Sequence, residues 1–279
     1  MRGRRAGIGF AVALVAAAGA ARADTSCPPT GETPAGPLAV GIGPVDFGGI
    51  PEACPVGDLA LRARVALLVA PGMPDYRGSI VSDAMLRVRH PVGARSWLSL
   101  ALDVLDFRYL NNGGLASTGF AFGPATVGYY RAVYATATTT TAAYGRVLLP
   151  IDTARQNGVE TGLEIGGSFR APLGSRAVAD GGLALTAPLD VVGGQLHGRL
   201  QPVVLAEAWL PLRPALSVGG GAAAMVELAP GARFITAAPR LSGRWALPRR
   251  FWMALLLELP VAGSDRPDFV GSLFGGLSL

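Results

Sequence analysis

The feature that most constrains the fold is a regular alternation of side chains that runs from residue 58 to the end of the chain. Apolar residues alternate with small or polar residues in stretches of about 9–15 residues, and turn-forming residues separate the stretches. In the stretch 159–171, Leu163 and Ile165 lie on one face of an extended chain, and Glu164 lies on the other. No stretch has a sustained helical period. A period of two is typical of strands with one apolar and one polar face, so the sequence predicts an all-β protein.

The alternation predicts about twelve strands, with a range of about ten to fourteen. Many are longer than the usual strand of about 5–6 residues, and they match the roughly 9–11 tilted residues that cross a bilayer. An even number of alternating strands in an exported chain is typical of a transmembrane antiparallel up-and-down β-barrel, which we predict for residues 58–279. The predicted strands are 58–70, 79–89, 96–109, 118–134, 138–149, 159–171, 182–190, 195–209, 214–228, 232–246, 251–261 and 268–279.

The composition agrees with a membrane barrel and excludes several other classes of protein. Charged residues make up 15% of the chain and hydrophobic residues 50%, whereas an average soluble domain has roughly 25% charged residues. These values exclude long disordered tracts and a coiled coil. All 24 basic residues are arginine, so no reaction that needs a lysine, such as Schiff-base formation, is available.

The first 23 residues are typical of a signal peptide for export. A positive segment with Arg2, Arg4 and Arg5 precedes an apolar segment, and Ala21-Arg22-Ala23 is a suitable cleavage site. An uncleaved membrane anchor is the alternative, for which the apolar segment is short. Cleavage would leave 20 arginines against 19 acidic residues, so the basic isoelectric point does not indicate a nucleic-acid partner. Export together with a barrel predicts the outer membrane of a Gram-negative bacterium.

Residues 24–57 differ from the rest of the chain, with seven prolines and seven glycines and no sustained period. We expect an irregular periplasmic arm here. Cys27 and Cys54 bracket it, and in an exported chain they are expected to form a disulfide worth roughly 3–4 kcal/mol. A redox or metal pair is the alternative, but two thiols without a nearby histidine make a poor metal site.

The charged residues of the predicted strands fall on the polar faces, which we expect to line the lumen. A charge that faces lipid at the middle of the bilayer costs about 2–4 kcal/mol. The positive and negative charges nearly balance, which favours pairing across neighbouring strands, and a ring that selects a substrate is the alternative. The predicted lumen residues are Arg62, Arg64, Asp83, Arg87, Arg89, Asp103, Glu160, Glu164, Arg170, His197, Arg199, Gln201, Glu207, Glu227, Arg240, Arg244 and Glu258.

The four tryptophans lie close to the ends of predicted strands, where indole rings would meet the membrane–water interface. Core tryptophans of a soluble β-sandwich are the alternative. With the C-terminus in the periplasm, the short turns 210–214 and 247–250 are periplasmic and the 150–158 loop is external. The 172–181 connection is long for a periplasmic turn. The predicted interface residues are Trp97, Trp209, Trp245 and Trp252.

Two stretches of sequence resemble a known group of barrels. The segment 148–154, Leu-Leu-Pro-Ile-Asp-Thr-Ala, is followed by a polar loop and a strand, and the segment 258–266, Glu-Leu-Pro-Val-Ala-Gly-Ser-Asp-Arg, leads into the last strand. They resemble outer-membrane porin-like and transporter-like barrels, in particular the group associated with the meta pathway of phenol degradation. The resemblance implies transport of a small solute, with outer-membrane lipid and the barrel-assembly machinery as partners. Such barrels usually end in an aromatic residue, and this chain ends in Leu279.

The sequence offers little catalytic chemistry. His90 and His197 are its only histidines, and no serine or cysteine motif accompanies either of them. We therefore predict no catalytic site, no metal site and no cofactor, and a barrel that passes or binds a small solute. The alternatives are an outer-membrane enzyme that modifies lipids through His197, and a soluble exported β-sandwich or structural protein.

Overall fold

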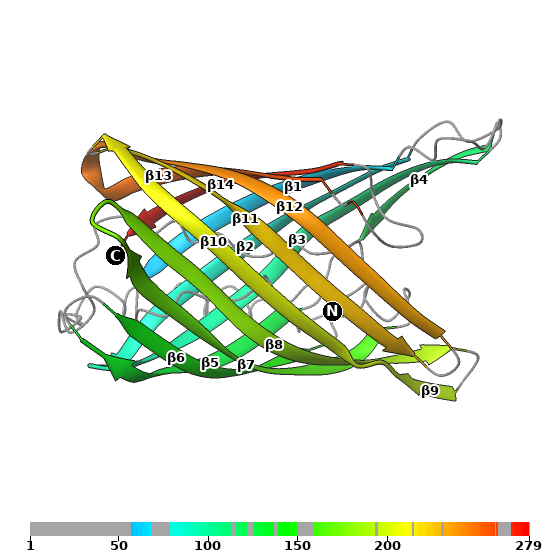
Figure 1. The fold of residues 1–279 in the computed structure, drawn as a ribbon. Coiled ribbons are helices and arrows are strands. Elements are labelled where there is room, and N and C mark those ends of the chain that lie inside the picture. The colour runs from blue at the N-terminus through cyan, green and yellow to red at the C-terminus, as the bar shows by residue number, and fades with distance from the viewer. Residues whose placement is uncertain are drawn as a thin grey trace, which may run out of the picture.

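The structure is a computed structural model, and the part of the chain that it describes consists almost entirely of strands (Figure 1). The predicted signal peptide, 1–23, and the predicted arm up to residue 56, with Cys27 and Cys54, lie outside the described residues. Within the described part of the chain, no helix is long and apolar enough to cross a membrane. The structure describes residues 57–68, 79–112, 115–121, 125–136, 139–149, 159–192, 195–213, 215–229, 232–259, 261 and 269–278.

The described residues form fourteen strands, β1–β14, and one short 3₁₀ helix, η2, at Pro248–Arg250. The strands are β1 (Asp58–Leu68), β2 (Ser79–Gly93), β3 (Ser96–Asn112), β4 (Leu115–Ala121), β5 (Ala125–Ala135), β6 (Thr140–Leu149), β7 (Val159–Leu173), β8 (Ala177–Val192), β9 (Gln195–Gly198), β10 (Gln201–Arg213), β11 (Leu216–Ala229), β12 (Ala232–Ala246), β13 (Phe251–Glu258) and β14 (Phe269–Ser278).

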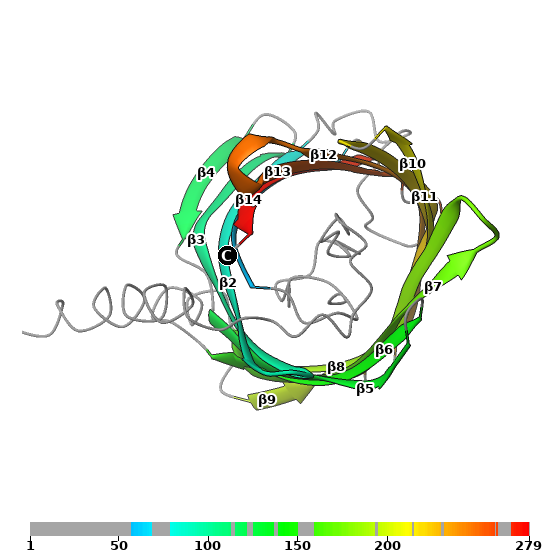
Figure 2. The same cartoon turned by 90° about the vertical axis from the view of Figure 1, so that its left-hand side faces the viewer.

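The strands close into a single antiparallel barrel. β1 pairs with β14 from Asp58↔Ser278 to Leu67↔Phe269, so the two ends of the sheet meet (Figure 2). β4 and β5 both pair with β3, and β9 and β10 both pair with β8. Each of these two pairs of strands therefore occupies one position in the wall, and the barrel has twelve strands. The prediction of a twelve-stranded up-and-down barrel is confirmed, and the closed ring excludes the soluble β-sandwich.

The break between β9 and β10 has a cause in the sequence. Pro188 on β8 and Pro202 on β10 have no amide hydrogen, so neither can donate to the ladder. At the break the amide of Arg199 donates to the carbonyl of Pro188, and Leu200 instead exchanges backbone hydrogen bonds with Leu228 of β11. The wall therefore stays hydrogen-bonded where the strand is interrupted.

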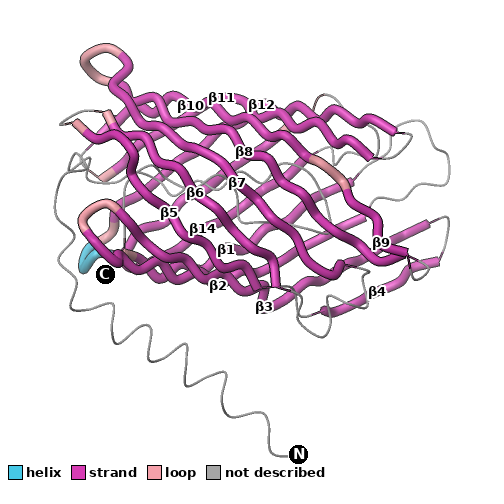
Figure 3. Tube along the Cα trace, turned by 90° about the horizontal axis from the view of Figure 1, so that it is seen from below, coloured by secondary structure: helices cyan, strands magenta, loops and turns pink. Residues whose placement is uncertain are grey.

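The connections are short at one end of the barrel, which we call the short-turn rim (Figure 3). β7 continues to Leu173 and β8 begins at Ala177, so the predicted ten-residue connection 172–181 is wrong. Residues 177–181 are small or polar and lack the large apolar side chains that make alternation visible, yet they pair with β7 and β10. Likewise β2 continues beyond the predicted strand 79–89 and includes His90 and Pro91.

The two faces of the wall differ sharply. On β6, the side chains of Ala142, Tyr144 and Arg146 are buried, and those of Ala143 and Val147, at alternate positions, are exposed. In a closed barrel one face of every strand lies inside, and the other faces outward. The exposed face carries large apolar side chains, which include Leu163, Ile165, Leu183, Ile235 and Leu241.

Candidate functional site: the polar interior of the barrel

The interior carries polar side chains that lie beside one another along the hydrogen-bonding direction. Cross-strand register places one residue from each neighbouring strand in a row, and side chains in such a row are close enough to interact. One row runs across seven strands, from β2 to β10. Its members are Arg89, Ser99, Gly128, Arg146, Glu164, Thr186 and Gln201.

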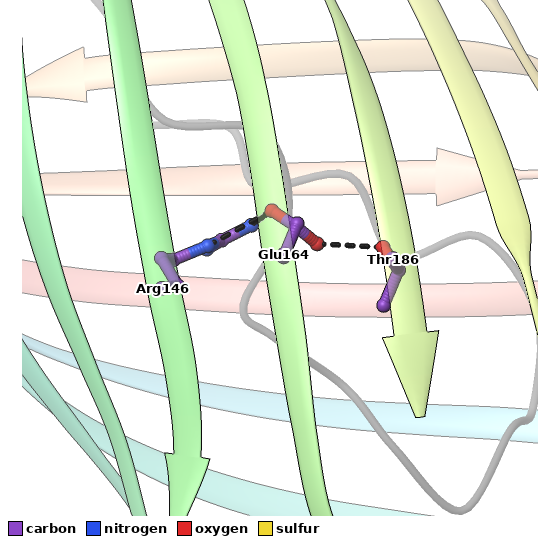
Figure 4. A network of polar contacts seen from close by, with 3 residues as sticks. All are labelled: Arg146, Glu164 and Thr186. Atoms are coloured by element: carbon purple, nitrogen blue, oxygen red, sulfur yellow. Dashed lines mark hydrogen bonds and ion pairs between the residues drawn. The ribbon is translucent and has the colours of Figure 1, made fainter. Parts of the chain in front are cut away.

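The centre of this row is a buried hydrogen-bonded network. Arg146 on β6 forms an ion pair with Glu164 on β7, with Nε donating to Oε1 over 2.9 Å. The hydroxyl of Thr186 on β8 donates to the other carboxylate oxygen, Oε2, over 2.9 Å. Figure 4 shows the three side chains meeting across three adjacent strands. Both Glu164 oxygens are thus occupied, which offsets the cost of burying the charge.

An aromatic stack lies next to this network. The rings of Trp97 and Tyr130 stack with centroids 5.2 Å apart, and those of Tyr130 and Tyr144 stack at 5.6 Å. The guanidinium of Arg146 lies over the Tyr144 ring at 5.2 Å from its centroid. Gly128 makes room for this arrangement, because a Cβ there would lie 2.7 Å from the Tyr130 hydroxyl and 2.9 Å from Cγ of Arg146.

A second buried network lies nearer the short-turn rim. Arg240 on β12 lies between two carboxylates, with its Nε 3.1 Å from Oε1 of Glu207 on β10 and 3.6 Å from Oε1 of Glu258 on β13. Glu207 also accepts a hydrogen bond of 3.2 Å from Nε1 of Trp209. All three ion-pair side chains are at most 3% exposed, so the pairing holds charges that have little contact with water.

Further interior pairs are less buried. Arg170 on β7 donates from Nη1 to Oδ2 of Asp180 on β8 over 3.2 Å. Glu227 on β11 accepts from Gln201 Nε2 at 2.7 Å and lies 3.5 Å from Nη1 of Arg199. The Arg199–Glu227 pair is half-buried. Both charges of this pair are therefore partly exposed.

The predicted lumen residues occupy several environments. His197 is exposed in β9, where register places it opposite Asp190, and Arg87, Arg199 and Glu227 are half-buried. The side chains of Arg62, Arg64, Asp83, Asp103 and Glu160 lie outside the described residues. The buried ones are Arg89, Glu164, Arg170, Gln201, Glu207, Arg240, Arg244 and Glu258.

The sequence prediction missed three polar members of the networks, Arg146, Asp180 and Thr186. Arg146 lies between Gly145 and Val147 in a predicted strand, and its alternation with Val147 was a signal that could have found it. Asp180 fell in the predicted 172–181 connection, so no face was assigned to it. Its partner Arg170 could not reveal it, because the pairing depends on the β7–β8 register.

The tryptophan prediction is wrong for three of the four residues. Trp97, Trp209 and Trp252 are 0%, 4% and 3% exposed and lie on the interior face, and Trp245 is 41% exposed on the outer face. Glycines on the neighbouring strands provide the space for two of the interior rings. A Cβ on Gly219 would lie 2.6 Å from the Trp209 ring, and one on Gly276 would lie 2.5 Å from the Trp252 ring.

The described residues contain no group of three or more histidine, cysteine, aspartate or glutamate side chains that could hold a metal ion. The acidic side chains of the interior face arginines instead. Arg244 takes part in a further interior contact, with its guanidinium 5.3 Å from the centroid of the Trp252 ring. The interior chemistry is therefore that of paired ions, amides and hydroxyls around aromatic rings.

Comparison with solved structures identifies the fold. An outer membrane channel from Pseudomonas putida F1 has 14% sequence identity and a TM-score of 0.64, over 85% of this chain and 100% of that chain. The translocator domain of the autotransporter NalP from Neisseria meningitidis has 10% identity and a TM-score of 0.52, over 80% and 87%. The β domain of the Bordetella autotransporter BrkA has 11% identity and a TM-score of 0.50, over 80% and 99%.

The chain has the fold of outer-membrane β-barrels. At these identities the likeness concerns the fold alone, because the same barrel serves a channel in one neighbour and an autotransporter in another. The chain matches no protein-family model and no curated protein sequence.

Proposed function

We propose that this protein is an outer-membrane β-barrel that passes or binds small solutes. The observation that carries the proposal is that large apolar side chains are exposed on the outside of the barrel and charged side chains are buried inside it. The outer face carries Leu183 and Ile165, which are 64% and 63% exposed, whereas Glu258 and Arg240 are buried inside. A soluble protein would bury the first pair and expose the second, because burying apolar surface is favourable and burying charge is costly.

A bilayer removes the cost of this arrangement. The exposed apolar side chains would contact lipid tails, and the interior ions would avoid the penalty of about 2–4 kcal/mol that a basic side chain incurs at the bilayer midplane. The lipids of the outer membrane and the barrel-assembly machinery are then the expected partners. The signal peptide predicted at residues 1–23 would deliver the chain to the periplasm.

Small aromatic compounds are the first solutes to test. The segments 148–154 and 258–266 resemble the barrel group associated with phenol degradation. The interior also holds a stack of aromatic rings, Trp97, Tyr130 and Tyr144, beside a polar network. These rings are buried, so the resemblance alone selects phenol as the solute to test first.

Two measurements test the proposal. The mature chain is refolded into phospholipid vesicles, and we expect a band on a denaturing gel that shifts on heating, as a membrane-inserted barrel requires. The refolded chain is then added to a planar bilayer, where we expect discrete conductance steps that phenol reduces in a concentration-dependent manner. Recovery of the native protein in the soluble periplasmic fraction would overturn the membrane assignment, and a heat-shifted barrel without conductance or phenol binding would overturn the transport assignment.

A further inference from the structure

Exposed arginines gather at one end of the part of the barrel whose side chains the structure describes. Among the side chains that the structure describes, every exposed charged residue is an arginine, and no exposed aspartate or glutamate accompanies them. All of these arginines lie at or near the short-turn rim, and none forms an ion pair with a described acidic residue. We call them the arginine collar, which consists of Arg95, Arg131, Arg176, Arg213, Arg249 and Arg250.

The collar extends around the rim rather than forming one patch. Arg95 lies in the β2–β3 turn, Arg176 in the β7–β8 turn and Arg213 at the end of β10. Arg131, on β5, is next to the β2–β3 turn, because the amide of Ala132 donates to the carbonyl of Arg95 over 2.8 Å. The charges are therefore distributed over several turns around the short-turn rim.

A belt of exposed aromatic side chains occupies the outer face at the same end. The Tyr129 hydroxyl donates to Oγ of Ser96 over 3.0 Å, so this ring points toward the rim. Rings with one apolar side and one wet side favour the membrane–water interface, where lipid headgroups lie. The members of the belt are Tyr129, Tyr134, Phe169, Trp245 and Phe251.

The β12–β13 turn combines both features. Arg249 and Arg250 have φ angles of 62° and 66°, in the left-handed region that asparagine and glycine adopt far more readily. The turn joins strands that carry the exposed rings of Trp245 and Phe251. Non-glycine residues with positive φ cost local stability and occur preferentially at functional sites, so this turn is a candidate binding position.

We propose that the arginine collar binds the phosphate groups of anionic phospholipids in the leaflet that surrounds the short-turn rim, with the Arg249–Arg250 turn as its strongest site. The proposal rests on the proposed function, since it requires the barrel to span a membrane. A guanidinium binds two phosphate oxygens at once. The aromatic belt, which favours the membrane–water interface, would place the short-turn rim at headgroup level. The described ion pairs of acidic side chains involve interior arginines and none of the collar arginines.

The test uses the mature chain refolded into phosphatidylcholine vesicles that contain a trace of spin-labelled lipid. Phosphatidylglycerol and phosphatidylcholine with the same labelled acyl chain are compared, and the motionally restricted fraction of each gives the selectivity for the anionic headgroup. We expect phosphatidylglycerol to be preferred severalfold, as adjacent basic residues near an anionic headgroup imply. We expect the preference to fall toward one in high salt.

Variants separate charge from folding. Arg249→Asn with Arg250→Gly removes both charges but supplies the residues that the turn prefers, so the barrel should fold at least as well and the selectivity should fall. Arg249→Lys with Arg250→Lys keeps the charge and should keep most of the selectivity. Replacing all six collar arginines with glutamine should bring the selectivity to about one.

An unchanged selectivity in the six-fold variant, with the heat-shifted band intact, would overturn the collar proposal while leaving the barrel assignment in place. A selectivity lost only in the six-fold variant, and not in the Asn-Gly variant, would overturn the assignment of the strongest site. Preferential binding of lipopolysaccharide by the same arginines would overturn the phospholipid assignment. Failure of the unmodified chain to give a heat-shifted band would instead count against the proposed function.

Discussion

Arg240 on β12 reaches Glu207 on β10 across the intervening strand β11, with its Nε 3.1 Å from Oε1. The register places Gly221 of β11 between them, opposite both residues. Any side chain at that position would stand between the guanidinium and the carboxylate. A glycine in the wall of the barrel is therefore a requirement of the buried ion pair.

Gly221→Ala is expected to destabilise the barrel by about 1–3 kcal/mol, the usual range for overpacking. The new Cβ would meet the carbonyl oxygen of Ala206 and would lie 2.7 Å from Cα of Glu207. The measurement is urea unfolding of the refolded chain in vesicles, followed by tryptophan fluorescence. Gly220→Ala is the matched control, because its Cβ would lie 3.6 Å from the nearest atom, the Arg240 carbonyl oxygen. Equal unfolding midpoints for the two variants would contradict the prediction.

The Arg146–Glu164 pair should show strong coupling in a double-mutant cycle. Glu164→Gln leaves the Arg146 charge buried without its counter-ion, and the loss of one partner of a buried pair typically costs about 3–5 kcal/mol. The double variant with Arg146→Gln should cost less than the sum of the two single changes. Urea unfolding of the four proteins gives the coupling energy. Additive effects would show that the pair contributes little beyond its packing.

Lipid-borne quenchers should distinguish the tryptophans by the face on which they lie. In chains that retain a single tryptophan, with phenylalanine at the other three positions, only Trp245 is expected to be quenched strongly by brominated acyl chains. The reason is that Trp245 is exposed on the outer face, whereas Trp209 and Trp252 lie on the interior face. Strong quenching of Trp209 by the same lipids would contradict the placement of that ring inside the barrel.

Glu227→Gln should shift the ion selectivity of the channel toward anions. Glu227 is half-buried and is the acceptor for both Arg199 and Gln201, so its neutralisation frees positive charge in the lumen. In a salt gradient the reversal potential should move in the anion-selective direction, and Glu227→Asp should leave its sign unchanged. The fold should tolerate the change, because a partly exposed ion pair contributes only about 1 kcal/mol or less. A reversal potential that moves toward cations would contradict the prediction.

The strands were largely predictable from the sequence because alternation is a local property. β12 has the predicted bounds, 232–246, and β7 begins at the predicted residue, Val159. The same alternation also indicated the face on which each tryptophan lies, and the tryptophan prediction did not use it. Trp209 shares its face with Glu207, and Trp252 shares its face with Glu258, so their parity already placed them inside. The expectation that indole rings favour an interface outweighed that pattern and was wrong.

By itself, the sequence determined that the chain forms strands with one apolar and one polar face, and about how many. Only the tertiary structure decided which strands meet, because closure depends on the pairing of β1 with β14. That pairing places Asp58 opposite Ser278, at opposite ends of the described chain. It also decided which charges pair. Arg240 contacts Glu207 because the register of β10, β11 and β12 places Gly221 between them. A period of two fixes the face of each side chain, but its neighbours on that face depend on contacts that local sequence does not encode.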